Sequence, residues 1–247
     1  HVPTLAPADH RRYQAQQLKL RPNVPATQEA EARFQLSGYY AQIDHLDANV
    51  GRVMERLNAE DMIQDTHLMF FSDHGDQMGS QGRFGKCVPY EESARVPFII
   101  GGGQPMSYGD WRCGNAPCLV NHVDIAPTTL GLCGIPTPDW MEGFDYSHRR
   151  TGINAKERIH QEPDSAYLQL IGDRESSYAW RCVITRDGWK YACVKNGEWL
   201  LFNLNDDPHE LNNLAFQTAH WKKRKELNEL LRDWATKTGD SFEFPAS

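Results

Sequence analysis

The chain has 247 residues, of which 40% are hydrophobic and 24% charged, a composition typical of a globular protein with its own core. Its 33 acidic and 26 basic residues give a net charge of -7, which provides no general attraction for nucleic acid or an anionic membrane. No run approaches the roughly 20 apolar residues that span a bilayer. We therefore expect neither a nucleic-acid partner nor a membrane partner.

The six cysteines form no C-x-x-C pair and no Cys/His spacing suited to structural zinc. Most are expected to be buried thiols. The sequence leaves a disulfide between two of them open, so it does not fix the redox compartment. We expect a soluble protein and favour the bacterial cytoplasm or periplasm, although no motif assigns either compartment.

The first half of the chain predicts a helix followed by two strands. Residues 1–27 contain four prolines, which favour an extended segment. Apolar residues at spacings of three and four then predict an amphipathic helix over Gln35–Asn58, with one face packed on a sheet. Thr66–Phe71 and Val96–Ile100 are short apolar runs, typical of parallel strands buried on both faces. Helix, strand, long loop and strand together predict an α/β layer sandwich.

The second half predicts one more helix, an antiparallel meander and a final helix. Asp124 is the expected N-cap of the first helix, and Gly134 its stop. Turn signals at Asp187-Gly188 and Asn196-Gly197 separate three expected strands, Arg181–Thr185, Lys190–Val194 and Glu198–Asn203. The final helix is expected over Gln217–Thr236, with a buried side made of Trp221, Leu227, Leu230, Leu231 and Trp234. We place the domain boundary between residues 155 and 156.

Asp73 and His74 directly follow the first predicted strand. Ligands of α/β sheets bind beyond the carboxyl ends of the strands, where this turn would lie. A carboxylate oxygen and a neutral imidazole nitrogen together suit a divalent cation. On the dipeptide alone, a turn cap at Asp73 and a hydrogen-bonded polar residue at His74 would be the better interpretation.

A long loop, residues 72–95, separates the two predicted strands and favours a cation site at Asp73 and His74 over a simple turn. It contains four glycines and exceeds the length at which an irregular connection usually has a function. Lys86 follows the last of these glycines. Its ammonium could bind an anionic group held at the cation, although a lone lysine is more often simply exposed.

Three blocks in this region carry a resemblance to a known family, namely residues 70–75 (FFSDHG), 82–86 (GRFGK) and 90–98 (YEESARVPF). In this order and spacing they resemble the second conserved stretch of the sulfatase family, within the alkaline-phosphatase-like superfamily. His1-Val2-Pro3 is similar to the family's His-x-Pro element, and residues 201–214 resemble its C-terminal signature. The resemblance implies that residues 1–155 are the second half of the sulfatase-like α/β domain and residues 156–247 its C-terminal subdomain.

The resemblance also implies roles for four residues. Asp73 and His74 would be metal ligands, Lys86 would bind a sulfate oxygen near the leaving group, and His1 would contact the ester and help to protonate the departing alcohol. Calcium is the family's metal, whereas the nitrogen ligand His74 keeps manganese and zinc open. Many family members carry Asn at this second position.

The family's nucleophile does not occur in this chain. It is a Cys or Ser in a Cys/Ser-x-Pro-x-Arg motif, oxidised to formylglycine, and a paired Asp-Asp completes the metal site. Cys87-Val88-Pro89 lacks the following arginine, so Cys87 is expected to be a packing residue. We expect the formylglycine and the remaining ligands in a missing N-terminal half of the same chain, which would be this segment's partner.

The predicted function is therefore part of a metal-dependent sulfatase that hydrolyses small sulfate esters, with this segment supplying ligands but not the nucleophile. We expect the 247 residues to be inactive alone. The alternatives are a phosphonate or phosphodiester hydrolase of the same superfamily, and a non-catalytic binding module or pseudoenzyme. Metal content and a comparison of sulfate with phosphate substrates would separate the enzymes. An upstream sequence without the nucleophile motif would favour the binding module.

Overall fold

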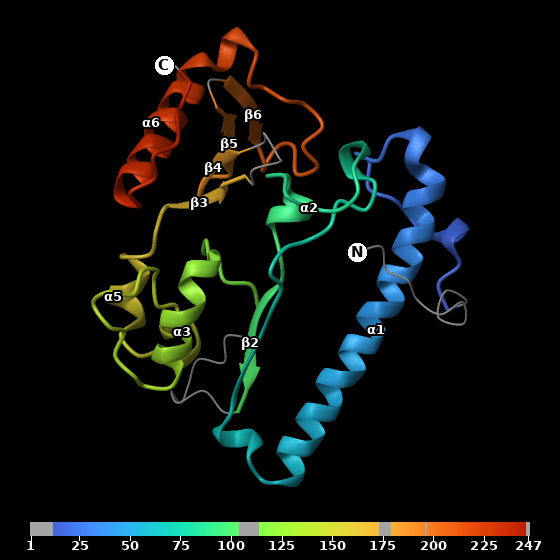
Figure 1. The fold of residues 1–247 in the computed structure, drawn as a ribbon. Helices are drawn as coiled ribbons and strands as arrows, with labels where there is room; N and C mark the ends of the chain where they lie inside the picture. Colours follow the sequence, from blue (N-terminus) through green and yellow to red (C-terminus); the bar gives the residue numbers. More distant parts are fainter. Residues whose placement is uncertain (1–11, 104–113, 173–178, 196, 246–247) are drawn as a thin grey trace. The chain divides into compact units, whose positions relative to one another are not determined.

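The computed structural model describes residues 12–103, 114–172, 179–195 and 197–245 (Figure 1). Contacts divide the chain into two compact units, residues 1–104 and residues 105–247. The domain boundary expected after residue 155 stays a prediction. Within the described ranges, no helix is both long and apolar enough to cross a membrane.

In the first unit, a long helix follows two short 3-10 turns, Ala15–Gln17 and Ala26–Gln28. This helix, α1 (Glu29–Ala59), begins earlier than predicted because the acidic side chains of its first turn suit the positive end of the helix dipole. Its apolar residues Ile43, Leu46 and Val53 are about half exposed, at 46%, 48% and 54%. The expectation that a sheet buries this helix face is therefore wrong for these three residues.

The sheet of the first unit has two strands, β1 (His67–Phe71) and β2 (Phe98–Gly102). They pair in antiparallel register, with Phe71 opposite Phe98, so the prediction of parallel strands is wrong. Burial on both faces is wrong as well, because Phe71 and Ile99 are 43% and 57% exposed. A parallel pair requires a crossover connection, whereas here the chain simply turns back. Both ends of the connecting loop therefore lie at the same end of the strand pair, next to Phe71 and Phe98.

The second unit begins with a group of short helices. The 3-10 turn His122–Asp124 leads into α3 (Ile125–Leu132), and α4 (His148–Thr151) and α5 (Ala155–Ile159) follow. Asp124 occupies the N-cap position of α3 as predicted, although its side chain makes no capping hydrogen bond to that helix. The side chain of Asn121 caps the preceding turn, accepting from the His122 N–H at 2.7 Å. Asp124 instead completes a capping box by accepting from the Asn121 N–H at 2.7 Å. Gly134, with φ 69°, ends the helix as predicted.

A four-stranded antiparallel sheet in the order β3-β4-β5-β6 forms most of the second unit. Its strands are β3 (Ser165–Leu170), β4 (Trp180–Thr185), β5 (Trp189–Val194) and β6 (Gly197–Asn203). The three predicted strands are confirmed, and β3 is an addition. The helix α6 (Trp221–Lys237) packs on this sheet.

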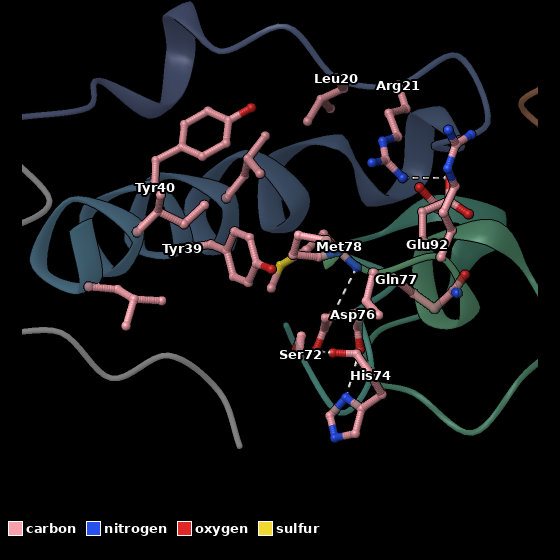
Figure 2. A pocket seen from close by; sticks show the side chains of 18 of the residues that line it. Leu20, Arg21, Tyr39, Tyr40, Ser72, His74, Asp76, Gln77, Met78 and Glu92 are labelled. Carbon is pink, nitrogen blue, oxygen red and sulfur yellow. Dashed lines mark hydrogen bonds and ion pairs between the residues drawn. The ribbon is translucent and has the colours of Figure 1, made fainter. Parts of the chain in front are cut away.

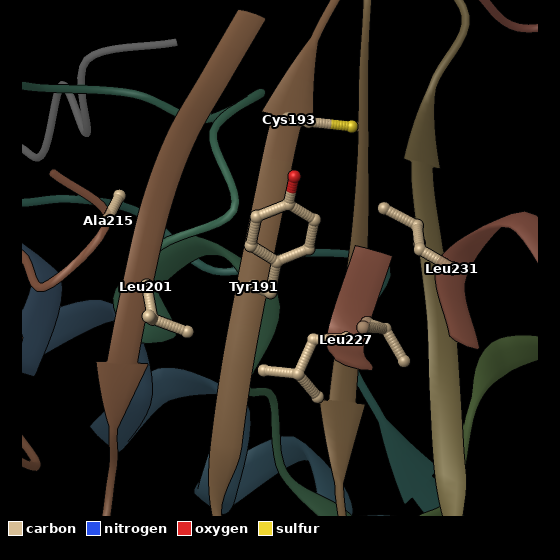
Figure 3. Close-up of a cluster of buried hydrophobic side chains, with 7 residues drawn as sticks. Tyr191, Cys193, Leu201, Ala215, Leu227 and Leu231 are labelled. Carbon is tan, nitrogen blue, oxygen red and sulfur yellow. The ribbon is translucent and has the colours of Figure 1, made fainter. Parts of the chain in front are cut away.

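The core of the second unit lies between this sheet and α6 (Figure 3). Its fully buried members are Val183, Tyr191, Cys193, Leu201, Ala215, Leu227 and Leu231. Leu230 and Trp234 pack against them as predicted, but Trp221 is 50% exposed, so its predicted burial is wrong. Trp221 is the first residue of α6, and the buried residues of this helix begin at Leu227.

The described cysteines are all free thiols. Cys182 and Cys193 are buried, as expected of most of them, whereas Cys87 and Cys133 are exposed. The expectation that Cys87 is a packing residue is therefore wrong. Cys87 lies within the loop of residues 72–95 and has φ 72°, a backbone conformation that is uncommon for residues with a side chain.

Asp240 joins the segment after α6 to the sheet. Its carboxylate accepts from Nε and Nη2 of Arg181 and from the Tyr167 hydroxyl. The hydrogen bonds from Arg181 chiefly lower the pKa of Asp240, to about 2. Since the folded-state pKa lies below the unfolded value of about 3.9, the stabilisation is complete above pH 4 and is lost as the pH falls toward 2.

We therefore expect Asp240→Asn to lower the free energy of unfolding by about 1–2 kcal/mol at pH 7. The difference from the parent should shrink between pH 4 and pH 2. Urea unfolding at several pH values measures it, and Asp233→Asn, on an exposed position of α6, is the control. A difference that stays constant down to pH 2 would contradict the role of the Asp240 carboxylate.

Candidate functional site

Asp73 and His74 follow β1 at the edge where the loop to β2 begins and ends. The Asp73 carboxylate is 84% exposed, and its Oδ1 accepts from the His74 backbone N–H at 2.9 Å. This hydrogen bond is the main reason that the pKa of Asp73 lies below its ordinary value, and the positive charge of Lys86 acts in the same direction. Asp73 is thus an anion facing solvent, with Oδ2 available to a ligand.

The ring of His74 is oriented by the next residue along the chain. Its Nδ1 lies 2.9 Å from the Gly75 carbonyl oxygen, which can only accept, so Nδ1 carries the proton of the neutral ring. Nε2 then carries the free lone pair of the ring, and it lies 3.4 Å from Oδ2 of Asp73. A carbonyl that fixes the ring in this manner is the usual partner of a metal-binding histidine.

The distance between these two atoms fits a shared cation. Two ligands placed about 2.1–2.4 Å from one ion and 90° apart are themselves about 3.0–3.4 Å apart. The pair therefore suits two adjacent ligand positions. Among the described residues no group of three or more His, Cys, Asp or Glu side chains is placed to hold a metal ion.

Glycine is required at position 75 by a close approach of the backbone to α2 (Glu91–Ala94). The Gly75 N–H donates to the Ser93 carbonyl oxygen at 2.9 Å. A Cβ built on Gly75 would lie 1.9 Å from the carbonyl oxygen of Glu92, far inside van der Waals contact. The loop that carries Asp73 and His74 is thereby pressed against the helix that precedes β2.

The loop between His74 and Lys86 has an unusual concentration of left-handed backbone. Besides three of its glycines, Met78 and Gln81 have φ values of 46° and 56°, and Cys87, directly after Lys86, has φ 72°. Such conformations cost on the order of 1–3 kcal/mol each for residues with a side chain and persist only where the surroundings enforce them. They accompany the candidate ligands, and Lys86 lies exposed near the end of this stretch.

A pocket of about 580 Å³ lies beside the loop, between α1 and the end of β1 (Figure 2). Its polar wall holds Glu92, whose side chain is only 4% exposed and accepts from Asn23 at 2.8 Å and Arg21 at 2.9 Å. Burial raises the pKa of Glu92, but these two partners outweigh it, so the pKa lies below the ordinary value. These contacts tie the segment before α1 to α2.

The site residues predicted from sequence have different outcomes. Asp73, His74 and Lys86 lie in one loop, and the charge of Lys86 acts on the Asp73 carboxylate. His1 lies outside the described residues. Sequence reasoning assigned no separate role to Asp76, whose carboxylate binds the loop backbone, or to the buried Glu92, which binds Asn23 and Arg21. The run Asp-His-Gly-Asp was the available signal for Asp76, whereas nothing local marked Glu92.

Comparisons with known proteins place the chain in a family. The family model described as Sulfatase matches residues 5–135, and the model described as N-sulphoglucosamine sulphohydrolase, C-terminal, matches residues 79–237. An ulvan-active sulfatase of Formosa agariphila is 31% identical over 245 residues, which is 93% of this chain and 44% of that protein. A choline-sulfatase of Rhizobium meliloti is 32% identical over 76% of this chain and 34% of its own length.

Solved structures show the same fold. The crystal structure of yidJ from Bacteroides fragilis, a candidate sulfatase, matches with a TM-score of 0.80 and 26% identity, covering 96% of this chain and 51% of that one. A phosphonate monoester hydrolase of Agrobacterium radiobacter shares the fold at a TM-score of 0.69 and 22% identity, over 85% of this chain and 42% of its own.

These matches define a chain of the alkaline-phosphatase-like superfamily, with the fold of the C-terminal half of a sulfatase. Within that superfamily the chain belongs to the sulfatase family. It spans less than half the length of the curated relatives it matches, 44% and 34% for the two sulfatases described above.

Proposed function

We propose that these residues form one wall of the active site of a metal-dependent sulfatase that hydrolyses small sulfate esters. The observation that carries the proposal is the 3.4 Å approach of Asp73 Oδ2 and His74 Nε2, with the ring fixed by the Gly75 carbonyl. In this proposal Asp73 and His74 hold a divalent cation, calcium by family expectation. The imidazole ligand also suits manganese or zinc.

Each residue has a distinct part in the proposed reaction. When bound, the cation would neutralise charge on the sulfate oxygens. Asp73 supplies a permanent anionic oxygen, and the Gly75 carbonyl keeps the Nε2 lone pair of His74 directed outward. The Lys86 ammonium binds a sulfate oxygen and stabilises negative charge that develops on the leaving oxygen. His1 contacts the ester and helps to protonate the departing alcohol.

The nucleophile belongs elsewhere in this proposal. The family resemblance implies a formylglycine and a paired Asp-Asp in the N-terminal half of the full-length protein. We accordingly propose that the 247 residues alone hydrolyse no sulfate ester. Turnover by the purified chain above that of a Lys86→Ala control would contradict this part of the proposal, because it would place a complete catalytic apparatus in these residues.

A phosphonate or phosphodiester hydrolase is the second candidate, since a phosphonate monoester hydrolase shares the fold. Comparing an aryl sulfate with an aryl phosphonate and a phosphodiester, each over a range of concentrations from below to above KM with the full-length protein, separates the candidates. We expect the largest kcat/KM for the sulfate ester. A larger value for either phosphorus substrate would reassign the function, and no turnover of any of them would favour a non-catalytic module.

A further inference from the structure

Residues 76–86, which we call the glycine loop, are joined at their two ends by the carboxylate of Asp76. Oδ1 of Asp76 accepts from the backbone N–H of Met78 at 3.0 Å and from that of Gly85 at 3.2 Å. The neighbouring N–H of Gln77 donates to the Gly85 carbonyl oxygen at 2.8 Å. Both backbone polar groups of Gly85 are therefore bound to the segment Asp76-Gln77, and the next residue is Lys86.

The start of this loop is itself held in place. Gly75 is bound to the Ser93 carbonyl oxygen, and Gln77 is 1% exposed. Figure 2 shows His74, Asp76 and Gln77 as consecutive parts of one wall of the pocket. The backbone that carries the candidate cation ligands is thus the same fixed segment that binds Gly85. The position of Lys86 relative to His74 depends on this link.

Backbone preference alone would not keep the loop in this shape. Between Asp76 and Lys86 the residues Met78 and Gln81 have positive φ, as do three glycines. Residues with side chains rarely adopt this conformation without enforcement from their surroundings. Further backbone hydrogen bonds close the tip of the loop, among them the one from the Gly79 N–H to the Arg83 carbonyl oxygen at 2.8 Å, and the Gln81 N–H binds the Asn23 carbonyl oxygen at 2.8 Å. Asp76 and Gln77 hold the base.

We propose that Asp76 is a positioning residue, which closes the glycine loop and thereby places the Lys86 ammonium beside the Asp73–His74 pair. This inference rests on the proposed function, since it needs Lys86 to act on the substrate. In this proposal Asp76 acts through the backbone N–H groups of Met78 and Gly85, which its Oδ1 binds, and not by contact with the substrate. Its effect on turnover passes through Lys86.

Two substitutions at Asp76 separate its hydrogen bonds from its charge. Asp76→Ala removes the acceptor and should lower kcat for a sulfate ester by about 10- to 100-fold in the full-length protein, the size expected when a reacting group is misplaced by about 1 Å. Asp76→Asn keeps an oxygen that can accept both N–H groups and should recover most of the activity. An Asn variant as impaired as the Ala variant would overturn the proposal.

A double-mutant cycle with Lys86→Ala tests the route of the effect. If Asp76 acts through Lys86, then Asp76→Ala/Lys86→Ala should be no slower than Lys86→Ala alone. If Lys86→Ala is strongly impaired and the effects of the two substitutions on kcat multiply in the double variant, the positioning role is overturned and the proposed function stays intact. A Lys86→Ala variant with full activity would instead reject the part of Lys86 in the proposed function.

Amide hydrogen exchange gives a readout that does not depend on catalysis. In the 247-residue chain, Asp76→Ala should accelerate exchange of the Met78 and Gly85 amides, while Asp76→Asn should leave both protected. The Gly75 amide, bound to Ser93, is the internal reference and should not change. Unchanged protection of Gly85 in the Ala variant would show that Asp76 does not close the loop, which would overturn the inference.

Discussion

Lys86→Ala should lower kcat for a sulfate ester by about 10²–10³-fold in the full-length protein, because it removes a charge aimed at the developing negative charge of the transition state. The melting temperature should change little, since Lys86 is exposed. Measuring kcat and the melting temperature of the same variant separates a role in turnover from a role in folding. Substitution of a residue needed only for folding would lower both.

Two control variants sharpen the Lys86 experiment. Lys156→Ala removes an equally exposed lysine from α5 and should leave both the rate and the melting temperature unchanged. Lys86→Arg keeps the charge in a wider group and should retain part of the activity. Full activity of Lys86→Ala would contradict the proposed role, whereas a large fall in melting temperature would assign Lys86 a structural one.

Lys190→Met should destabilise the second unit by about 3–5 kcal/mol, the cost of leaving a buried charge without its partner. The Lys190 ammonium in β5 donates to the Glu210 carboxylate at 2.8 Å, and both side chains are 0% exposed. Glu210 also has φ 54°, so this ion pair holds a strained loop residue. Urea unfolding followed by circular dichroism measures the loss.

The chain provides a matched control for this ion pair. Lys195 and Glu243 lie 3.1 Å apart with side chains 63% and 62% exposed, so Lys195→Met should cost less than about 1 kcal/mol. The double variant Lys190→Met/Glu210→Leu removes both buried charges and should recover part of the stability. Equal effects of Lys190→Met and Lys195→Met would contradict the importance of burial.

Turn signals and helical periodicity predicted most of the second unit. The turn signals Asp187-Gly188 and Asn196-Gly197 predicted the breaks between β4, β5 and β6, whose buried residues form consecutive runs, and the helical spacing of Leu227 and Leu231 predicted the buried side of α6. The pattern was weaker for β3, since Ser165 and Ala166 at its start are poor strand formers. Strand direction was not predictable for β1, because an apolar run is the same in either direction.

The candidate site also combines residues that the sequence predicts with contacts that it does not. Asp73, His74 and Lys86 could be predicted because the chemistry of these residues and their spacing are local properties of the sequence. The contacts that support the loop could not be predicted from the sequence. Asn23 and Glu92 are 69 residues apart in the chain, and Gly75 is constrained by the backbone of α2, so only the fold reveals those contacts.

Calorimetric titration of the full-length protein, which in our proposal contains the remaining ligands, with Ca²⁺, Mn²⁺ and Zn²⁺ tests the central claim, that Asp73 and His74 hold a divalent cation. We expect binding of at least one of these ions, weakened about tenfold or more by His74→Ala and by Asp73→Ala. His160→Ala, an exposed histidine at the end of α5, should bind like the parent chain. Binding of none of the three ions, or equal affinities in the parent and both site variants, would contradict the account.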